Sequence, residues 1–264
     1  MEDYFYLKLL MAFVVGSTMV TLATVAAEKL GSKVGGFIGG LPTMVAITLF
    51  FIGYVQTPQT AAEATAPIPL IMAFNGIYLV VYVALSGWGT WIAMGGGFLV
   101  WLMLASLIIL LNLTDFYQAL LIYGILFFGS YQMLDKKWRL RSAGKLSIRY
   151  TPWQLLARAL FSGGVAVSAV YLSKVGGPIW GGIMAPFPVV YLSTLFILAR
   201  SWGIRYSLAI TKSLLVSACV NVVVYAFAVR YSYPALGLGM GTIVALAFAG
   251  VSALGTYSFL KRMS

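Results

Sequence analysis

The sequence predicts an all-α polytopic membrane protein whose helices cross the bilayer about nine times. Of its 264 residues, 61% are hydrophobic and only 9% are charged, whereas an ordinary soluble domain carries about 25% charged residues. The mean hydropathy is +0.96. Since a spanning helix needs about 20 apolar residues, the chain has room for roughly nine or ten spans. This composition excludes a soluble globular protein and predicts a single membrane domain over residues 1–264.

Long uncharged stretches predict the individual helices. The longest stretch, 64–114, is too long for one helix, and Ser86-Gly87-Trp88-Gly89 in its middle supplies the residues of a turn. The expected helices cover 6–28, 34–55, 63–85, 90–111, 115–134, 152–173, 178–200, 206–229 and 234–259. This interpretation gives nine helices with short connections.

A basic loop at 135–151 indicates how the chain is oriented. Its cations are Lys136, Lys137, Arg139, Arg141, Lys145 and Arg149. Because cytoplasmic loops are enriched in Lys and Arg, we expect this loop in the cytoplasm, the N-terminus outside and the C-terminus inside the cell membrane. Lys8, Lys174 and Arg230 alone fall on the outer side against this rule. The net charge is +11. We expect this basic excess to reflect contact of the loop with anionic lipid headgroups, and we expect no nucleic-acid partner.

An internal repeat appears when the chain is shifted by 146 residues against itself. The matching residues are Leu9-Leu10 with Leu155-Leu156, Gly35-Gly36 with Gly181-Gly182, Pro42 with Pro188, Thr48-Leu49-Phe50 with Thr194-Leu195-Phe196, Thr65 with Thr211, Asn75 with Asn221, Ser86 with Ser232, and Met94-Gly95 with Met240-Gly241. Repeat one is 6–111, repeat two is 152–259, and the helix 115–134 links them.

The linking helix makes the two four-helix repeats inverted in the membrane, because the number of spans between equivalent points is odd. Inverted repeats are the plan of many secondary transporters, in which two alternative packings open to opposite sides. The alternative is that duplication built a stable bundle without transport.

Glycine and proline interrupt the second helix of each repeat, at Gly35–Thr43 and at Gly176–Pro188. Proline removes a helical hydrogen bond, and the freed carbonyls inside a membrane need another partner. Paired interruptions in inverted halves indicate a substrate site, so we predict Pro42, Thr43 and Pro188 as site residues. The alternative is close helix packing through small residues.

Polar residues near mid-membrane complete the predicted site. Asn75 and Asn221 occupy equivalent positions and are expected to contact either a substrate or a neighbouring helix. Thr48 and Thr194 are weaker candidates, since a threonine hydroxyl often bonds to its own helix. Tyr191 is the last candidate, from the second repeat alone.

Two cations and several aromatic residues have alternative interpretations. Arg158 and Lys212 lie about two turns into their helices, where they either form a positive vestibule or extend to the membrane interface. Aromatic residues at predicted helix ends indicate interfacial belts: Trp88, Trp91, Trp138, Trp153, Tyr231 and Tyr233.

Some chemistries have no residues to support them. The chain has no histidine and a single cysteine, Cys219, and its six acidic residues lie outside the centres of apolar runs. We therefore expect no metal, no cofactor and no enzymatic activity. Without a buried carboxylate, a neutral, zwitterionic or anionic substrate is favoured over a bare cation.

The segment Leu155–Val229 resembles the GlpM-type family of small bacterial inner-membrane proteins. The resemblance rests on Gly181–Val190, with its Pro-Phe-Pro run, followed by Thr194-Leu195 and Arg200. It implies a shared membrane architecture and no catalytic residue, because no activity is established for that family. This chain differs in being a fused, roughly doubled form, with Gly39-Gly40-Leu41-Pro42 in place of the Pro-Phe-Pro run.

Together these features predict a secondary transporter or facilitator of a small solute, which works by alternating access between inverted repeats. The alternative is an accessory membrane protein of lipid or envelope assembly, acting through its basic loop without transport. Formation of a homo-oligomer is compatible with both.

Overall fold

The computed structural model describes residues 3–29, 41–138, 140 and 150–263, and these residues form helices and turns without a β-strand. Six helical stretches of this part of the chain are long and apolar enough to cross a membrane. They are Tyr4–Ala26, Pro58–Trp88, Thr90–Leu110, Pro152–Gly176, Pro178–Trp202 and Ile204–Arg262. The chain is therefore an all-α, multi-pass membrane protein.

Large apolar side chains cover the outer surface of these helices. Leu110, Leu121, Ile125 and Val251 are each more than 60% exposed, although they lie within long apolar helices. A contiguous apolar surface of this extent is unfavourable in water but matches the hydrocarbon of a bilayer. The exposed faces are thus the lipid-facing ones.

The N-terminal half alternates long helices with short breaks. Its elements are α1 (Asp3–Lys29), α3 (Thr43–Val55), α4 (Pro58–Ala64), α5 (Ile68–Leu85), the 3₁₀ turn η1 (Ser86–Trp88), α6 (Thr90–Leu110), α7 (Phe116–Gln132) and the π-helical turn η2 (Met133–Lys137). The turn predicted at 86–89 is confirmed, and Gly89 completes it with a φ of +103°, a conformation that favours glycine. The predicted helix 63–85 is interrupted between α4 and α5.

The C-terminal half begins at a capping box, in which Thr151 and Gln154 each bond to the other's backbone. Its elements are α8 (Pro152–Gly176), α9 (Pro178–Met184), α10 (Val189–Trp202), α11 (Ile204–Ala209), α12 (Thr211–Leu214), the π-helical turn η3 (Leu215–Cys219) and α13 (Val220–Met263). The predicted interruption of helix 178–200 is confirmed between α9 and α10.

α13 is folded back on itself at Gly237, where φ is +71°. The turn comes later than the predicted boundary at 229–234, because Pro234 is accommodated within the helix and glycine alone tolerates the left-handed backbone. The Ser252 hydroxyl donates to Asn221 Oδ1 at 2.7 Å, so the two limbs of α13 run side by side. Tyr233, predicted in an interfacial belt, is instead fully buried at this fold and bonds to Thr242.

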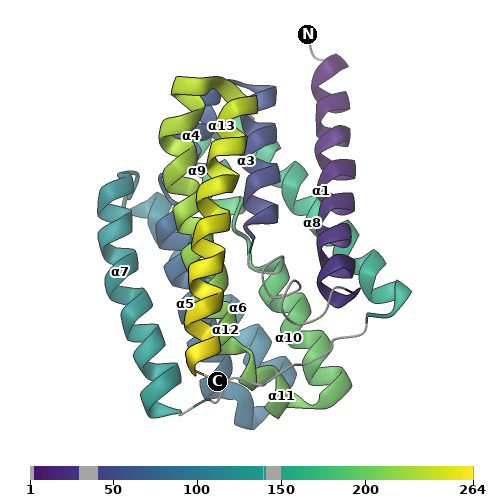
Figure 1. The fold of residues 1–264 in the computed structure, drawn as a ribbon, viewed down its shortest axis with the longest axis vertical. Coiled ribbons are helices and arrows are strands. Elements are labelled where there is room, and N and C mark those ends of the chain that lie inside the picture. Colours follow the sequence, from purple (N-terminus) through teal and green to yellow (C-terminus); the bar gives the residue numbers. More distant parts are fainter. Residues whose placement is uncertain (1–2, 30–40, 139, 141–149, 264) are drawn as a thin grey trace.

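The central helix of the bundle is α5, which contacts α6, α7, η3 and α13. α1 packs against α8 and α3, while α4 contacts α9 and α13. α1 starts at the end marked N in Figure 1 and α13 finishes at the opposite end, marked C. The predicted glycine run at 35–40 and most of the basic loop, at 139 and 141–149, lie outside the described residues.

Candidate functional site

The site is built around the junction between α9 and α10, where Pro186-Phe187-Pro188 interrupts the helix. Ala185 N–H still donates to Gly181 O at 2.9 Å, but the next turns tighten, with Phe187 N–H bonded to Met184 O and Val189 N–H to Phe187 O. Because the two prolines have no N–H, carbonyl groups of this segment need partners from elsewhere.

Asn75 of α5 supplies one such partner. Its side-chain nitrogen donates to Pro186 O at 3.0 Å and lies 3.6 Å from Met72 Sδ. The residue is fully buried, and its Oδ1 has no hydrogen-bond partner among the described residues. Asn75 therefore holds the broken helix in place and retains one free acceptor beside it.

Tyr191 and Cys219 connect this junction to η3. The Tyr191 hydroxyl oxygen and Cys219 Sγ are 3.4 Å apart, and Cys219 Sγ donates to Met72 O at 3.4 Å. Both side chains are buried. The predicted Tyr191 thus belongs to the same polar cluster as Asn75, which we call the junction cluster: Met72, Asn75, Pro186, Tyr191 and Cys219.

Phe187 points into an aromatic contact with α6 that the sequence interpretation missed. Its ring centroid lies 5.2 Å from that of Trp101 and 5.7 Å from that of Phe98. Trp101 is buried, and within the described part of the chain its Nε1 has no hydrogen-bond partner, as is also true of the Tyr78 and Tyr123 hydroxyls. A tryptophan in the middle of an apolar helix, far from both interfaces, was the signal that could have identified this contact.

The glycines of α9 serve close packing, the alternative considered for this motif. A methyl group on Gly182 would overlap the carbonyl oxygen of Ala64, and one on Gly181 would lie 2.6 Å from Ser173 Cβ. The backbone of α9 therefore lies directly against α8 and the turn between α4 and α5. Packing and site formation coexist here.

The predicted residues of the first repeat lie at the start of α3. Pro42 is buried just before the helix, and Ala46 N–H donates to Pro42 O at 2.8 Å. Thr43, half-buried, is the first helical residue. Thr48 is fully buried, but its hydroxyl donates to Met44 O of its own helix, as expected for a weak candidate.

Asn221 accepts from Ser252 and Thr256 on the second limb of α13. These bonds are contacts between helix limbs, which was the alternative role considered for this residue. The described role of Asn221 therefore differs from that of Asn75, which joins α5 to the junction between α9 and α10.

Arg158 and Lys212 are both buried, which contradicts the alternative in which they extend to the membrane interface. Lys212 forms a salt bridge with Asp135 of η2. Arg158 Nη1 donates to Thr194 Oγ1 at 3.3 Å and to the Tyr150 hydroxyl at 3.4 Å. The predicted Thr194 is therefore partner to a buried cation.

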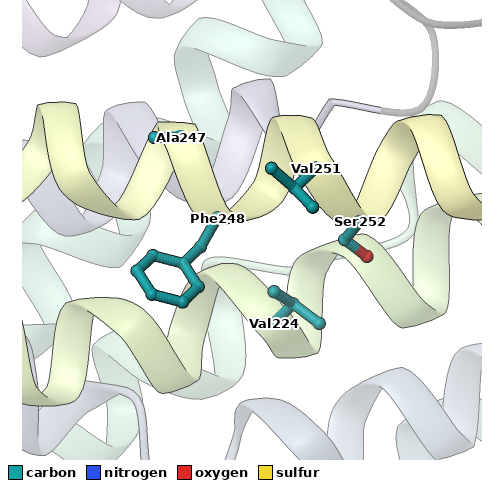
Figure 2. A pocket seen from close by; sticks show the side chains of 5 residues that line it. All are labelled: Val224, Ala247, Phe248, Val251 and Ser252. Atoms are coloured by element: carbon teal, nitrogen blue, oxygen red, sulfur yellow. The ribbon is translucent and has the colours of Figure 1, made fainter.

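An open apolar pocket of about 380 Å³ lies between the limbs of α13 (Figure 2) and holds none of the predicted site residues. Its lining residues are Val224, Ala247, Phe248, Val251 and Ser252. The one hydroxyl among them, that of Ser252, is already bonded to Asn221. The apolar lining of this pocket suits lipid chains rather than a polar solute.

Comparison of the chain with protein-family models, with curated proteins and with solved structures found no match. The resemblance to the GlpM-type family stays a prediction.

Proposed function

We propose that the protein is a secondary transporter or facilitator of a small neutral, zwitterionic or anionic solute, with nine spans arranged as two inverted four-helix repeats. The observation that carries this proposal is the local match between the two helix starts at Pro42 and Pro188. Pro42 has φ −78° and ψ 47°, and Pro188 has φ −74° and ψ 34°. Each is followed by the same pair of backbone bonds, including Ala46 N–H to Pro42 O and Leu192 N–H to Pro188 O.

Helix boundaries support the same shift of 146 residues. α3 starts at Thr43 and α10 at Val189, while α4 starts at Pro58 and α11 at Ile204. Both pairs of starts differ by the shift that aligns the sequence repeat. Thr65 and Thr211, which are equivalent, each bond through the hydroxyl to a carbonyl three residues earlier.

The contact between α1 and α8 supports an inverted relationship. Phe5 lies near Tyr171, whereas the Ser17 hydroxyl donates to Ala159 O, so the two equivalent helices run antiparallel. They cross where a methyl group on Gly16 would lie 3.7 Å from Gly163 Cα.

This crossing pairs equivalent positions. Under the repeat, Gly16 corresponds to Ser162 and Ser17 to Gly163. A methyl group on Gly16 would lie 3.7 Å from Ser162 O, and one on Gly163 would overlap Ser17 Oγ, so equivalent positions face each other as a two-fold axis in the membrane plane would place them. In transporters with inverted repeats, such an axis relates the two alternative packings of the halves.

The proposed solute site comprises the junction cluster together with Pro188 and Thr194, and it is closed in this structure. Asn75, Tyr191, Thr194 and Pro188 are buried, and no carboxylate belongs to the cluster. The solute is therefore proposed to bind through the Asn75 carboxamide and neighbouring hydroxyls after one half moves relative to the other.

The proposed orientation places the N-terminus outside and the C-terminus in the cytoplasm. Three cations fall on the outer side, and each lies over an aromatic ring: Lys8 over Tyr54, Lys174 over Phe5 and Arg230 over Phe116. Cation–π contacts lower the cost of holding a cation there. These contacts make the three exceptions compatible with the charge rule.

Solute entry into proteoliposomes tests the proposal. Vesicles with and without protein are exposed to gradients of neutral, zwitterionic or anionic solutes, and swelling is followed by light scattering. We expect one class to enter faster through the protein and Asn75→Leu to abolish the difference. If no class enters faster, and neutralising Lys136 and Lys137 instead abolishes binding to anionic vesicles, the accessory role is favoured.

A further inference from the structure

Arg158 is a buried cation that no described acidic side chain accompanies. Its side chain is 8% exposed, and its partners are the Tyr150 and Thr194 hydroxyls and the Tyr150 ring, 5.7 Å from the guanidinium carbon. The salt bridge among the described residues joins Lys212 to Asp135 instead. A guanidinium in this position carries a positive charge that neutral hydroxyls do not offset.

Two buried polar atoms on this part of α8 have no hydrogen-bond partner among the described residues. They are Arg158 Nε and the hydroxyl of Ser162, which is 1% exposed. Residues four apart share one face of a helix, so both atoms belong to the same face of α8. Thr194 accepts the Arg158 bond, which leaves its own hydroxyl hydrogen free to donate. This face of α8 and Thr194 of α10 thus offer a cation and three unused donors.

The other repeat shows that this helix contact does not require a charge. The position equivalent to Arg158 is Ala12, which is fully buried, and the position equivalent to Thr194 is Thr48. Thr48 bonds to Met44 O of its own helix. Since α1 and α3 pack with an alanine and a threonine at these two positions, the guanidinium adds something other than packing.

We propose that Arg158, Ser162 and Thr194 form a binding site for an oxyanion, either a carboxylate or a phosphate group. A planar guanidinium with its Nε free binds such groups through charge-assisted hydrogen bonds. This inference rests on the proposed function, because Thr194 belongs to the proposed solute site, and it narrows the solute to one with an anionic group. An anionic lipid headgroup presents the same chemistry.

Equilibrium binding tests the site without any transport. The full chain, purified in a neutral detergent, is titrated with inorganic phosphate or acetate at constant ionic strength set by chloride, and thermal unfolding is followed by tryptophan fluorescence. We expect saturable stabilisation of the wild type. Arg158→Gln is expected to raise the apparent Kd by roughly tenfold to a hundredfold, the usual value of a charge-assisted bond.

Arg205→Gln is the matched control, because it removes the same charge from an exposed position on α11. Its Kd is expected to equal that of the wild type. Thr194→Val keeps the shape of residue 194 and the charge of Arg158, so this variant is expected to fold even if Arg158→Gln does not. It is expected to weaken oxyanion binding severalfold.

A lipid-binding measurement distinguishes a lipid headgroup from a free solute as the source of the oxyanion. The same variants are placed in nanodiscs of phosphatidylcholine with or without phosphatidylglycerol, and bound lipid is measured after detergent extraction. Retention of phosphatidylglycerol that depends on Arg158, without stabilisation by phosphate or acetate, indicates a headgroup. Stabilisation by the free anions indicates a solute.

The proposal is overturned if neither the free anions nor phosphatidylglycerol binds the wild type, or if Arg158→Gln, Thr194→Val and Arg205→Gln all bind as it does. Failure of this site and failure of transport are distinguishable. A protein that moves neutral solutes but binds no oxyanion contradicts the site alone, and one that binds an oxyanion but moves no solute contradicts transport alone.

Discussion

The side-chain amide of Asn75 donates to the carbonyl oxygen of Pro186, which is 111 residues further along the chain. This bond joins α5 of the first half to the broken helix of the second half. Pro186 lies where two prolines interrupt helical hydrogen bonding. Inside the membrane, the amide supplies the hydrogen bond that water would supply to a broken helix at a protein surface. The same bond must be rearranged if the two halves move.

Replacing Asn75 is expected to destabilise the protein. In Asn75→Leu the buried carbonyl of Pro186 loses its partner, which costs about 1–3 kcal/mol. Asn75→Asp keeps the shape but replaces the donor with an acceptor, so it is expected to cost at least as much. Thermal unfolding in detergent measures both. Thr48→Val, equally buried but bonded within its own helix, is the control and should change stability much less.

Close approach of α9 to the turn after α4 predicts a steric effect at Gly182. A methyl group there overlaps backbone at Ala64, so Gly182→Ala is expected to cost about 1–3 kcal/mol of stability. Gly164→Ala, in α8, meets no atom within 4 Å and should be neutral or slightly stabilising. Equal unfolding temperatures for the two variants would contradict this packing.

The salt bridge between Lys212 and Asp135 predicts unequal effects of its two single variants. Lys212 is buried and Asp135 is a third exposed. Asp135→Asn leaves a buried cation unpaired, so it should destabilise more than Lys212→Met, which leaves a hydrated carboxylate. The double variant should recover part of the loss. Additive losses in this double-mutant cycle would show that the two groups do not interact.

The arrangement of the spans predicts that the two ends of the chain lie on opposite faces of the membrane. Reporter domains active only outside the cytoplasm should work when fused before Asp3, and reporters active only inside should work when fused after Ser264. Neutralising the cations of the basic loop 135–151 should weaken this preference. Both reporters active on one face would contradict an odd number of spans.

Sequence patterns predicted the membrane class, the turn at Ser86–Trp88 and the interruption before Pro188. They did so because these features depend on local chemistry: apolar length, glycine conformation and the missing N–H of proline. The turn of α13 was placed a few residues early, at 229–234, whereas the positive φ that turns the chain lies at Gly237.

Tertiary partners could not be predicted in the same way. Asn75 was predicted as a site residue, but none of its neighbours in the sequence indicates that Pro186 is its partner. For Lys212, extension to an interface was one of two alternatives, because its distant partner Asp135 could not be identified from the sequence. Tyr233 was assigned to an aromatic belt, and only the fold of α13 brings its hydroxyl to Thr242.

Alternating access at the junction cluster is tested most directly at Cys219, which is the only cysteine of the chain and lies beside Tyr191 and Met72. In vesicles of each orientation, a membrane-impermeant thiol reagent is added to one face at a time. Ala249→Cys in a Cys219→Ser background, buried on α13 away from the junction, is the control. Two inverted halves that open in turn predict slow labelling of Cys219 from either face and none of the control. Labelling of Cys219 from neither face, or from one face alone, would contradict alternating access at this site.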